Sequence, residues 1–270
     1  CLSAGDHALV VDSVYGPTRR FCDTMLKRLG VEVTYYDPTI GAGIAELIRP
    51  NTKLVHTEAP GSNTFEMQDI PAIAKAAKSA GAVVTIDNTW ATPLYFRPLD
   101  HGVDISIHAA TKYPAGHSDI LIGTVSANEA LWPKLNEAYT VLGLSVGPDD
   151  AYATLRGLRT MGVRLERHQA SALEIASWLD GREEVARVLH PALPGFPGHD
   201  IWKRDFTGAS GIFSIVLDVP DAQAWTRKAH AFLDALDIFG LGYSWGGYES
   251  LAVHRSEERR VGKECKHWWG

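Results

Sequence analysis

The sequence has only three cysteines in 270 residues, and no two of them form a CxxC pair. Cysteines so few and so scattered are typical of a reducing compartment, so we expect a cytoplasmic protein. Long apolar runs are also absent: the run at 82–86 is among the longest, whereas roughly 20 residues are needed to span a bilayer. No excess of positive charge is present either, because the net charge is −6. We therefore expect neither nucleic acid nor a membrane as a partner.

Both ends of the chain differ from its middle. No methionine precedes Cys1, and an apolar run follows almost at once at 8–11, so we interpret the chain as a fragment that begins inside a domain. From residue 255 to residue 270 half of the residues are charged, and the segment has neither helical nor strand periodicity. We interpret 255–270 as a non-native tail and assign it no function.

Strand-like and helix-like segments alternate along the first part of the chain. Short apolar runs predict strands at 8–11, 31–35, 53–56, 82–86, 103–107 and 121–125. Helical patterns lie between them at 19–29, 44–48 and 70–80. Near-continuous apolar strands separated by helices favour an α/β fold whose mixed, mostly parallel sheet is covered on both faces.

The second part of the chain has a different pattern. A long helical segment over 149–179 is followed by strand-like runs at 185–189 and 211–216 and by a helical pattern at 222–235. This pattern predicts a smaller C-terminal α+β domain. We expect the large domain over 1–158 and the small domain over 159–254.

Three of the predicted strands are followed by side chains suited to chemistry, namely Tyr15, Asp87 and Lys112. Open α/β sheets bind their ligands beyond the carboxyl ends of the strands. A lysine that is partly desolvated in such a place has a lowered pKa and can act as an amine nucleophile. The sequence therefore predicts a ligand site at this edge of the sheet. The alternative for Asp87 is a side chain that only caps a loop.

An acid, a strand-end lysine with a neighbouring hydroxyl, and an aromatic ring are the groups that pyridoxal 5'-phosphate (PLP) requires. Lys112 would carry the aldehyde, Asp87 would keep the pyridine nitrogen protonated, and the ring of Tyr15 would stack on the pyridine. The hydroxyl of Thr111 and nearby backbone N–H groups would bind the phosphate.

Four motifs contain or follow these residues. They are Asp-Asn-Thr-Trp at 87–90, Ala-Thr-Lys-Tyr at 110–113, Gly-His-Ser-Asp at 116–119 and Tyr-Ser-Trp-Gly-Gly-Tyr-Glu-Ser-Leu at 243–251. In this order they resemble the Cys/Met-metabolism family of PLP-dependent enzymes, and within it the β-lyase branch. The resemblance extends from about residue 5 to residue 253. It implies a fold-type-I, PLP-dependent transferase-like architecture with a sheet of the seven-stranded type.

The resemblance also implies a role for each candidate residue. Lys112 corresponds to the Schiff-base lysine and to the base that removes the Cα proton of the substrate. The other correspondences are Asp87 with the acid at the pyridine nitrogen, Tyr15 with the stacked catalytic ring, Thr111 with a phosphate-binding hydroxyl, and Ser244 and Trp245 with residues near the substrate carboxylate.

The reaction that the resemblance implies is β-elimination by a carbon–sulfur lyase, which cleaves L-cystathionine to homocysteine, pyruvate and ammonia in methionine biosynthesis. Ala109, where many relatives have serine, and Trp245 favour this branch over cystathionine γ-lyase, cystathionine γ-synthase and methionine γ-lyase. The resemblance further implies a homotetramer whose subunits share active sites. Because the family's phosphate-binding turn and its carboxylate-binding arginine fall outside 5–253, we expect this fragment itself to be inactive.

A serine hydrolase is a distant alternative. Gly-Tyr-Ser-Trp-Gly at 242–246 matches the GxSxG motif, which in α/β-hydrolases is followed by an acid and then a histidine. No aspartate follows Ser244, and the next residues do not have a helical pattern. We interpret the match as accidental.

Other classes fit the sequence less well. A dinucleotide fingerprint starting at Gly41 and Gly43 fails because its third glycine position holds Glu46. The histidines are scattered, so we predict no metal site. A non-catalytic interaction protein would leave the strand-end Lys112 unexplained.

Overall fold

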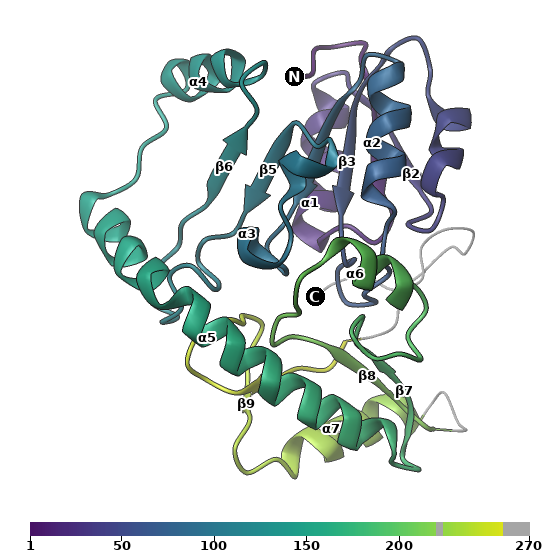
Figure 1. The fold of residues 1–270 in the computed structure, drawn as a ribbon, viewed down its shortest axis with the longest axis vertical. Helices are drawn as coiled ribbons and strands as arrows, with labels where there is room; N and C mark the ends of the chain where they lie inside the picture. Colours follow the sequence, from purple (N-terminus) through teal and green to yellow (C-terminus); the bar gives the residue numbers. More distant parts are fainter. Residues whose placement is uncertain (220–223, 256–270) are drawn as a thin grey trace.

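The structure is a computed structural model that describes residues 1–219 and 224–255 (Figure 1). Its main sheet has the strand order β2-β1-β3-β4-β5-β6, and all neighbouring strands are parallel except β5 and β6. The strands are β1 His7–Val11, β2 Glu32–Tyr36, β3 Thr52–Glu58, β4 Val83–Asp87, β5 Ile105–His108 and β6 Thr124–Ala127. The predicted α/β fold with a mixed, mostly parallel sheet is confirmed. Among the described residues this sheet has six strands, where the resemblance implies a seven-stranded type.

Helical segments connect these strands and pack beside the sheet (Figure 1). They are α1 Gly16–Phe21, its continuation η1 Cys22–Leu26, η2 Gly41–Leu47, α2 Ile70–Ser79, α3 Thr92–Tyr95 and η3 Pro98–His101. In α2 the side chains that recur at helical spacing are buried, from Ile70 through Ile73 to Ala77. Asp69 caps this helix, because its carboxylate accepts a hydrogen bond from the Ala72 N–H at 3.1 Å.

The second part of the chain begins with the long helix α5, Pro148–Asp180, which crosses from the main sheet to a second group of elements (Figure 1). There β7 Val185–Leu189 pairs antiparallel with β8 Ser214–Leu217, and β9 Gly240–Leu241 pairs parallel with β10 Leu251–Ala252. Helices α6 His199–Asp205 and α7 Trp225–Asp234 complete this part, which agrees with a small α+β arrangement. The domain boundary between 158 and 159 falls within α5 and stays a prediction.

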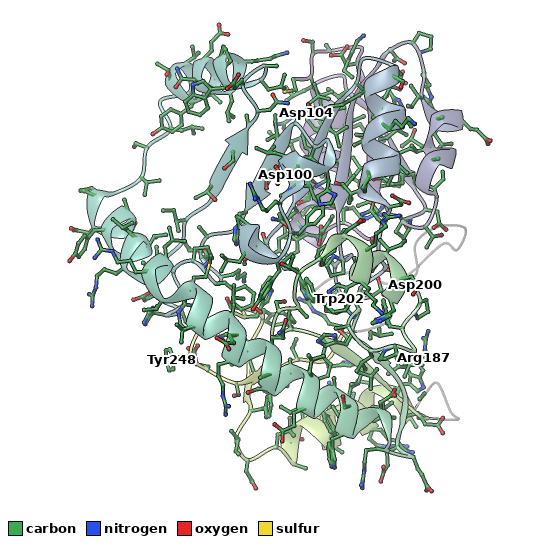
Figure 2. The ribbon with its side chains drawn as sticks, in the orientation of Figure 1. Asp100, Asp104, Arg187, Asp200, Trp202 and Tyr248 are labelled. Atoms are coloured by element: carbon green, nitrogen blue, oxygen red, sulfur yellow. The ribbon has the colours of Figure 1, made fainter. Side chains whose placement is uncertain are left out.

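Asp104, which precedes β5, stabilises the amino ends of the central strands, away from the carboxyl ends where the site is predicted (Figure 2). Its carboxylate accepts hydrogen bonds from the Val84 N–H at 2.9 Å and from Asn128 Nδ2 at 2.8 Å, and it lies 3.0 Å from Lys78 Nζ. These contacts join β4, β5, α2 and the residue after β6. They fix the register in which β4 and β5 present their carboxyl ends.

Several predicted boundaries differ from the structure. The strand predicted at 121–125 begins only at Thr124, and the helix predicted at 19–29 begins at Gly16 and stays helical through η1 to Arg28. Four helical segments were not predicted: α3, η3, α4 Trp132–Val141 and α6. The segments α3, η3 and α6 are at most seven residues long, too short for a helical period to show, and no residue of α4 is buried. Residues 220–223 and 256–270, which include most of the interpreted tail, lie outside the described residues.

Within the residues that the structure describes, no helix combines the length and the apolar character needed to cross a lipid bilayer. The same residues contain no cluster of three or more histidine, cysteine or acidic side chains that could bind a metal ion.

Candidate active site

The structure brings the predicted residues to one edge of the main sheet. Asp87 is the last residue of β4, Lys112 lies in the turns after β5, and Tyr15 follows β1. Because β1, β3, β4 and β5 run parallel, their carboxyl ends meet at this edge. The edge is also where the segment that follows β9 comes back to the sheet, and it carries Ser244 and Trp245.

Tyr15 is tied to the end of β3. Its backbone N–H donates a hydrogen bond to Glu58 Oε2 at 2.7 Å, while 49% of the tyrosine remains exposed. The ring is therefore available to a ligand at the edge of the sheet. Glu58 itself is the register partner of Asp87 in the neighbouring strand.

The pair Glu58 and Asp87 places two carboxyl groups side by side at the ends of β3 and β4. Burial, together with the negative charge of Asp87, raises the pKa of Glu58 well above its ordinary value. A protonated Glu58 removes one of the two negative charges at this edge. Sequence analysis gave Glu58 no role, because the strand predicted at 53–56 stops two residues before it.

Asp87 is held by the turn that follows it. Its Oδ1 accepts a hydrogen bond from the Thr89 N–H at 2.9 Å, which is the only hydrogen bond of the Asp87 carboxylate among the described residues. The hydroxyl of Thr89 in turn accepts a hydrogen bond from the Ala109 N–H at 2.9 Å. The turn after β4 therefore fastens the segment that leads to Lys112, and it leaves the second oxygen of Asp87 for a ligand.

Buried histidines lie behind the carboxylates. Burial lowers the pKa of His108 to about 4 although Asp87 opposes this shift, and it also lowers the pKa of His56. His56 Nδ1 pairs with Thr85 Oγ1 at 2.8 Å, whereas the Nε2 atoms of both histidines are buried without a hydrogen-bond partner among the described residues. Both imidazoles are therefore neutral at neutral pH.

Lys112 is half-buried and meets the distant segment after β9. Its Nζ donates a hydrogen bond to Ser244 Oγ at 3.0 Å and lies 5.3 Å from the ring centre of Trp245. Burial lowers the pKa of the Lys112 amine, so a larger fraction of it is unprotonated at neutral pH than in an exposed lysine. The ring of Trp245 also packs edge-on against Tyr113, with 5.4 Å between the ring centres.

The Thr111 hydroxyl forms two hydrogen bonds with the backbone of Ile122, across the loop that follows Lys112. Its hydroxyl donates to Ile122 O at 3.1 Å and accepts from the Ile122 N–H at 2.9 Å. The Thr111 N–H also donates to Ile122 O at 3.0 Å. Ile122 O would therefore keep a hydrogen bond if the hydroxyl turned to a phosphate oxygen.

The donor set at this edge fits PLP. It combines a half-buried amine with a lowered pKa, a carboxylate oxygen without a hydrogen bond among the described residues, an exposed tyrosine ring and a hydroxyl that can turn. The hydroxyl of Ser13, just before Tyr15, is buried without a partner among the described residues, which leaves one more group for a ligand. The site and the sheet thus define an α/β protein suited to an aldehyde-bearing, phosphorylated aromatic cofactor.

Comparison with known families agrees with this class. The family described as "Cys/Met metabolism PLP-dependent enzyme" matches residues 1–264, and the chain belongs to this family. Members of the family are PLP-dependent, as its description states.

Individual relatives cover almost the whole chain. A Rhizobium johnstonii protein named "Putative cystathionine beta-lyase" is 75% identical over 253 residues, which are 94% of this chain and 64% of that protein. The Escherichia coli protein named "Cystathionine beta-lyase MetC" is 48% identical over 259 residues, 95% of this chain and 65% of that protein. The chain thus spans less than two thirds of the length of these two relatives.

A solved structure confirms the fold class. The crystal structure of a cystathionine gamma-lyase from Lactobacillus plantarum, complexed with L-serine, superposes with a TM-score of 0.87 and 33% sequence identity. The superposition covers 93% of this chain and 64% of that chain. The mostly parallel sheet and the smaller C-terminal part are therefore those of PLP-dependent cystathionine enzymes.

Proposed function

We propose that the protein containing this chain is a carbon–sulfur β-lyase that cleaves L-cystathionine to homocysteine, pyruvate and ammonia. The names of the relatives from R. johnstonii and E. coli support cystathionine as the substrate. In this proposal the homocysteine released serves methionine biosynthesis. The observation that carries the proposal is the half-buried Lys112 amine, 3.0 Å from Ser244 Oγ, at the same sheet edge as Asp87.

Four residues would hold the cofactor. Lys112 Nζ would bond to the aldehyde carbon of PLP, the carboxylate of Asp87 would pair with the pyridine nitrogen, and the ring of Tyr15 would stack on the pyridine. Thr111 would donate its hydroxyl hydrogen to the phosphate. When bound, PLP supplies an acceptor for the electrons released as the Cα–H and Cβ–S bonds of the substrate break.

Lys112 is the base of the reaction in this proposal. With the substrate bound, the Lys112 amine would remove the proton from the substrate Cα. The lowered pKa of this amine favours the unprotonated form that such a base needs. Ser244 accepts a hydrogen bond from Nζ and so orients the amine toward the substrate.

Asp87 and Trp245 would act on either side of this amine. A carboxylate of Asp87 at the pyridine nitrogen keeps that nitrogen protonated. The ring of Trp245, 5.3 Å from Nζ, shields the amine from water and lies near the place expected for the substrate carboxylate.

A second candidate is γ-elimination or γ-replacement by the same site. The likeness to a cystathionine gamma-lyase structure supports it, because that protein is 33% identical over almost the whole chain. Residues that bind PLP do not by themselves decide which bond breaks after Cα is deprotonated. We favour β-elimination because the most similar of the relatives described above carry that name.

Assembly into a homotetramer with shared active sites is part of the proposal. Large apolar side chains are exposed along the segment from the loop before β6 to the first half of α5: Leu121, Val141, Leu142, Leu144, Tyr152 and Val163. Figure 1 shows α4 and the start of α5 standing apart from the rest of the chain. Exposed apolar surface of this extent is typical of a subunit interface, and sedimentation equilibrium would measure the assembly.

We also place the protein in the cytoplasm. Cys1 and Cys22 are free thiols in the structure, which fits a reducing compartment.

The test of the proposed function is an absorbance spectrum recorded after incubation with PLP. We expect a visible band from lysine-bound cofactor in the parent and in Lys75→Ala, whose lysine is exposed on α2, and no band in Lys112→Ala. A band that persists in Lys112→Ala would contradict the proposal. If the parent shows no band, the same spectra are recorded with the chain extended to the length of its relatives, where a second absence would also contradict it.

Product analysis then separates the two candidate functions. Pyruvate and homocysteine released from L-cystathionine support β-elimination. Release of 2-oxobutyrate and cysteine would instead support γ-elimination.

A further inference from the structure

The segment between β9 and β10, residues 242–250, carries Ser244 and Trp245 but has little support of its own. The strands at its two ends, Gly240–Leu241 and Leu251–Ala252, pair with each other over only two residues. Several side chains in it are exposed, among them Tyr248, which Figure 2 shows beside α5. Its position relative to Lys112 must therefore depend on contacts made along the segment itself.

Tyr243 lies under the guanidinium of Arg255, at 4.7 Å, and Trp245 packs against the main hydrophobic core. The remaining contacts are made with the residues from Lys112 to Ser118. Ser244 meets Lys112 at the start, and Trp245 packs on Tyr113. Gly246 has a left-handed φ of 79°, and a Cβ there would lie only 3.0 Å from the Tyr113 N atom. The two backbones thus approach as closely as a residue without a side chain permits.

The far end of the contact is a hydrogen bond between Ser118 and Glu249. The Ser118 hydroxyl donates to Glu249 Oε2 at 2.5 Å, although the two residues are 131 positions apart. This bond holds the pKa of the Glu249 carboxyl below its ordinary value. Ser118 has a φ of 59°, a left-handed conformation that is unusual for serine, so the loop is held in a shape that needs such a contact.

Gly247 lies within this contact. A Cβ at position 247 would overlap with Ser118 Oγ and would lie 2.8 Å from Glu249 Oε2. Only glycine therefore lets the carboxylate of Glu249 reach over its own backbone to Ser118.

We propose that Glu249 is a positioning residue, which through Ser118 holds residues 243–249 against residues 112–118 and so keeps Ser244 and Trp245 at the Lys112 amine. Its consequence for catalysis rests on the proposed function, in which the Lys112 amine is the base. The contact itself does not depend on that function. Glu249 touches neither the amine nor the sheet edge where PLP would bind, so its effect reaches the reaction only through the segment.

Hydrogen exchange in the cofactor-free chain tests the contact. We expect Glu249→Ala and Ser118→Ala to speed amide exchange in residues 243–249 by about two- to fivefold, the size expected for one exposed hydrogen bond to a charged group. The double variant should exchange no faster than either single one, because both remove the same bond. Glu249→Gln keeps an acceptor oxygen and should restore most of the protection.

A measurement of the Lys112 pKa shows whether Glu249 positions the segment at the amine or only stabilises the loop. Competitive labelling of the lysine amines across a range of pH values, followed by mass spectrometry, gives this pKa in the same cofactor-free chain. When residues 243–249 move away, water reaches the amine, so the pKa of Lys112 should rise toward its ordinary value in Glu249→Ala.

Asp119→Ala is the matched control. Asp119 is an exposed carboxylate next to Ser118 and has no hydrogen bond or ion pair among the described residues. Burial is the cause of the lowered pKa of Lys112, so Asp119→Ala should leave this pKa unchanged while Glu249→Ala raises it.

Unchanged exchange in Glu249→Ala would overturn the proposal, and so would a Lys112 pKa that does not rise in Glu249→Ala or that rises equally in Asp119→Ala. A parent protein that fails to bind PLP would count against the proposed function instead, and the exchange result would stand.

Discussion

Lys112 Nζ donates a hydrogen bond to Ser244 Oγ across 3.0 Å, although 132 positions separate the two residues in the chain. The contact joins the edge of the large sheet to the segment between β9 and β10 in the smaller part of the chain. Residues of both parts therefore surround the half-buried amine. Substitutions in either part should change the position or the pKa of this amine.

In the PLP-loaded chain extended to the length of its relatives, Ser244→Ala should lower kcat on L-cystathionine about tenfold, because one hydrogen bond that orients the base is lost. The visible absorption band should remain, since Lys112 still bonds to the cofactor. Ser250→Ala, an exposed serine of the same segment, is the control and should leave kcat unchanged. A Ser244→Ala protein with the parent's kcat would show that the hydrogen bond does not orient the amine.

In the same extended chain, Asp87→Ala should impair proton removal more than cofactor attachment. Without the carboxylate the pyridine nitrogen loses its proton, so turnover should fall about 100-fold or more while the absorption band persists. Turnover and the band are measured on the same preparation. Unchanged turnover in this variant would contradict the role proposed for Asp87.

The sequence could predict the main sheet because its strands are buried. Every residue of β1 is buried, so its apolar run is continuous and points to a strand covered on both faces. The end residues Asp87 and Lys112 followed from the same reasoning, since parallel strands end at one edge. Helices α4 and α6 were missed, because no residue of α4 is buried and the seven residues of α6 are too few to show a helical period.

Contacts between distant segments could not be predicted from the sequence. Glu249 stands in a motif that identified the family, but no spacing rule pairs it with Ser118, 131 positions away. Glu58 escaped notice because its importance depends on the register of β3 with β4, which places it beside Asp87. A pattern along one strand shows which residues are buried, whereas register and loop docking are settled only when the chain has folded.

Gly157→Ala should destabilise the protein. Gly157 lies in α5, where a Cβ would overlap with the backbone oxygens of Pro114 and Ala115 in the turn after Lys112. Overpacking of this kind costs about 1–3 kcal/mol of the free energy of unfolding, measured by urea denaturation.

Gly162→Ala is the matched control in the same helix. The nearest atom to its Cβ would be Leu94 Cδ1 at 3.9 Å, so the substitution fits. Because alanine is the better helix former, this variant should be more stable than the parent by about 0.5–1 kcal/mol. Equal stabilities for the two variants would show that the approach of α5 to the Lys112 turn does not constrain the fold.

The stability of the protein should fall between pH 7 and pH 5 because of His190. This histidine is fully buried between Trp90 and Phe213, and burial lowers its pKa from 6.5 to about 4. Its Nδ1 accepts a hydrogen bond from the Ala192 N–H at 3.1 Å, so the neutral ring is the form that the fold requires.

The unfolded chain binds a proton at His190 below pH 6.5, whereas the folded chain binds it only near pH 4. The contribution of the neutral ring is therefore complete above pH 6.5 and is lost as the pH falls toward 4. From the two pKa values, roughly 2 kcal/mol of the free energy of unfolding is lost between pH 7 and pH 5 through this residue. His190→Asn keeps an acceptor for the Ala192 N–H but does not titrate, so urea denaturation at the two pH values should show a smaller loss by that amount. The same loss in the parent and in His190→Asn would mean that His190 does not stay neutral in the folded protein at pH 5.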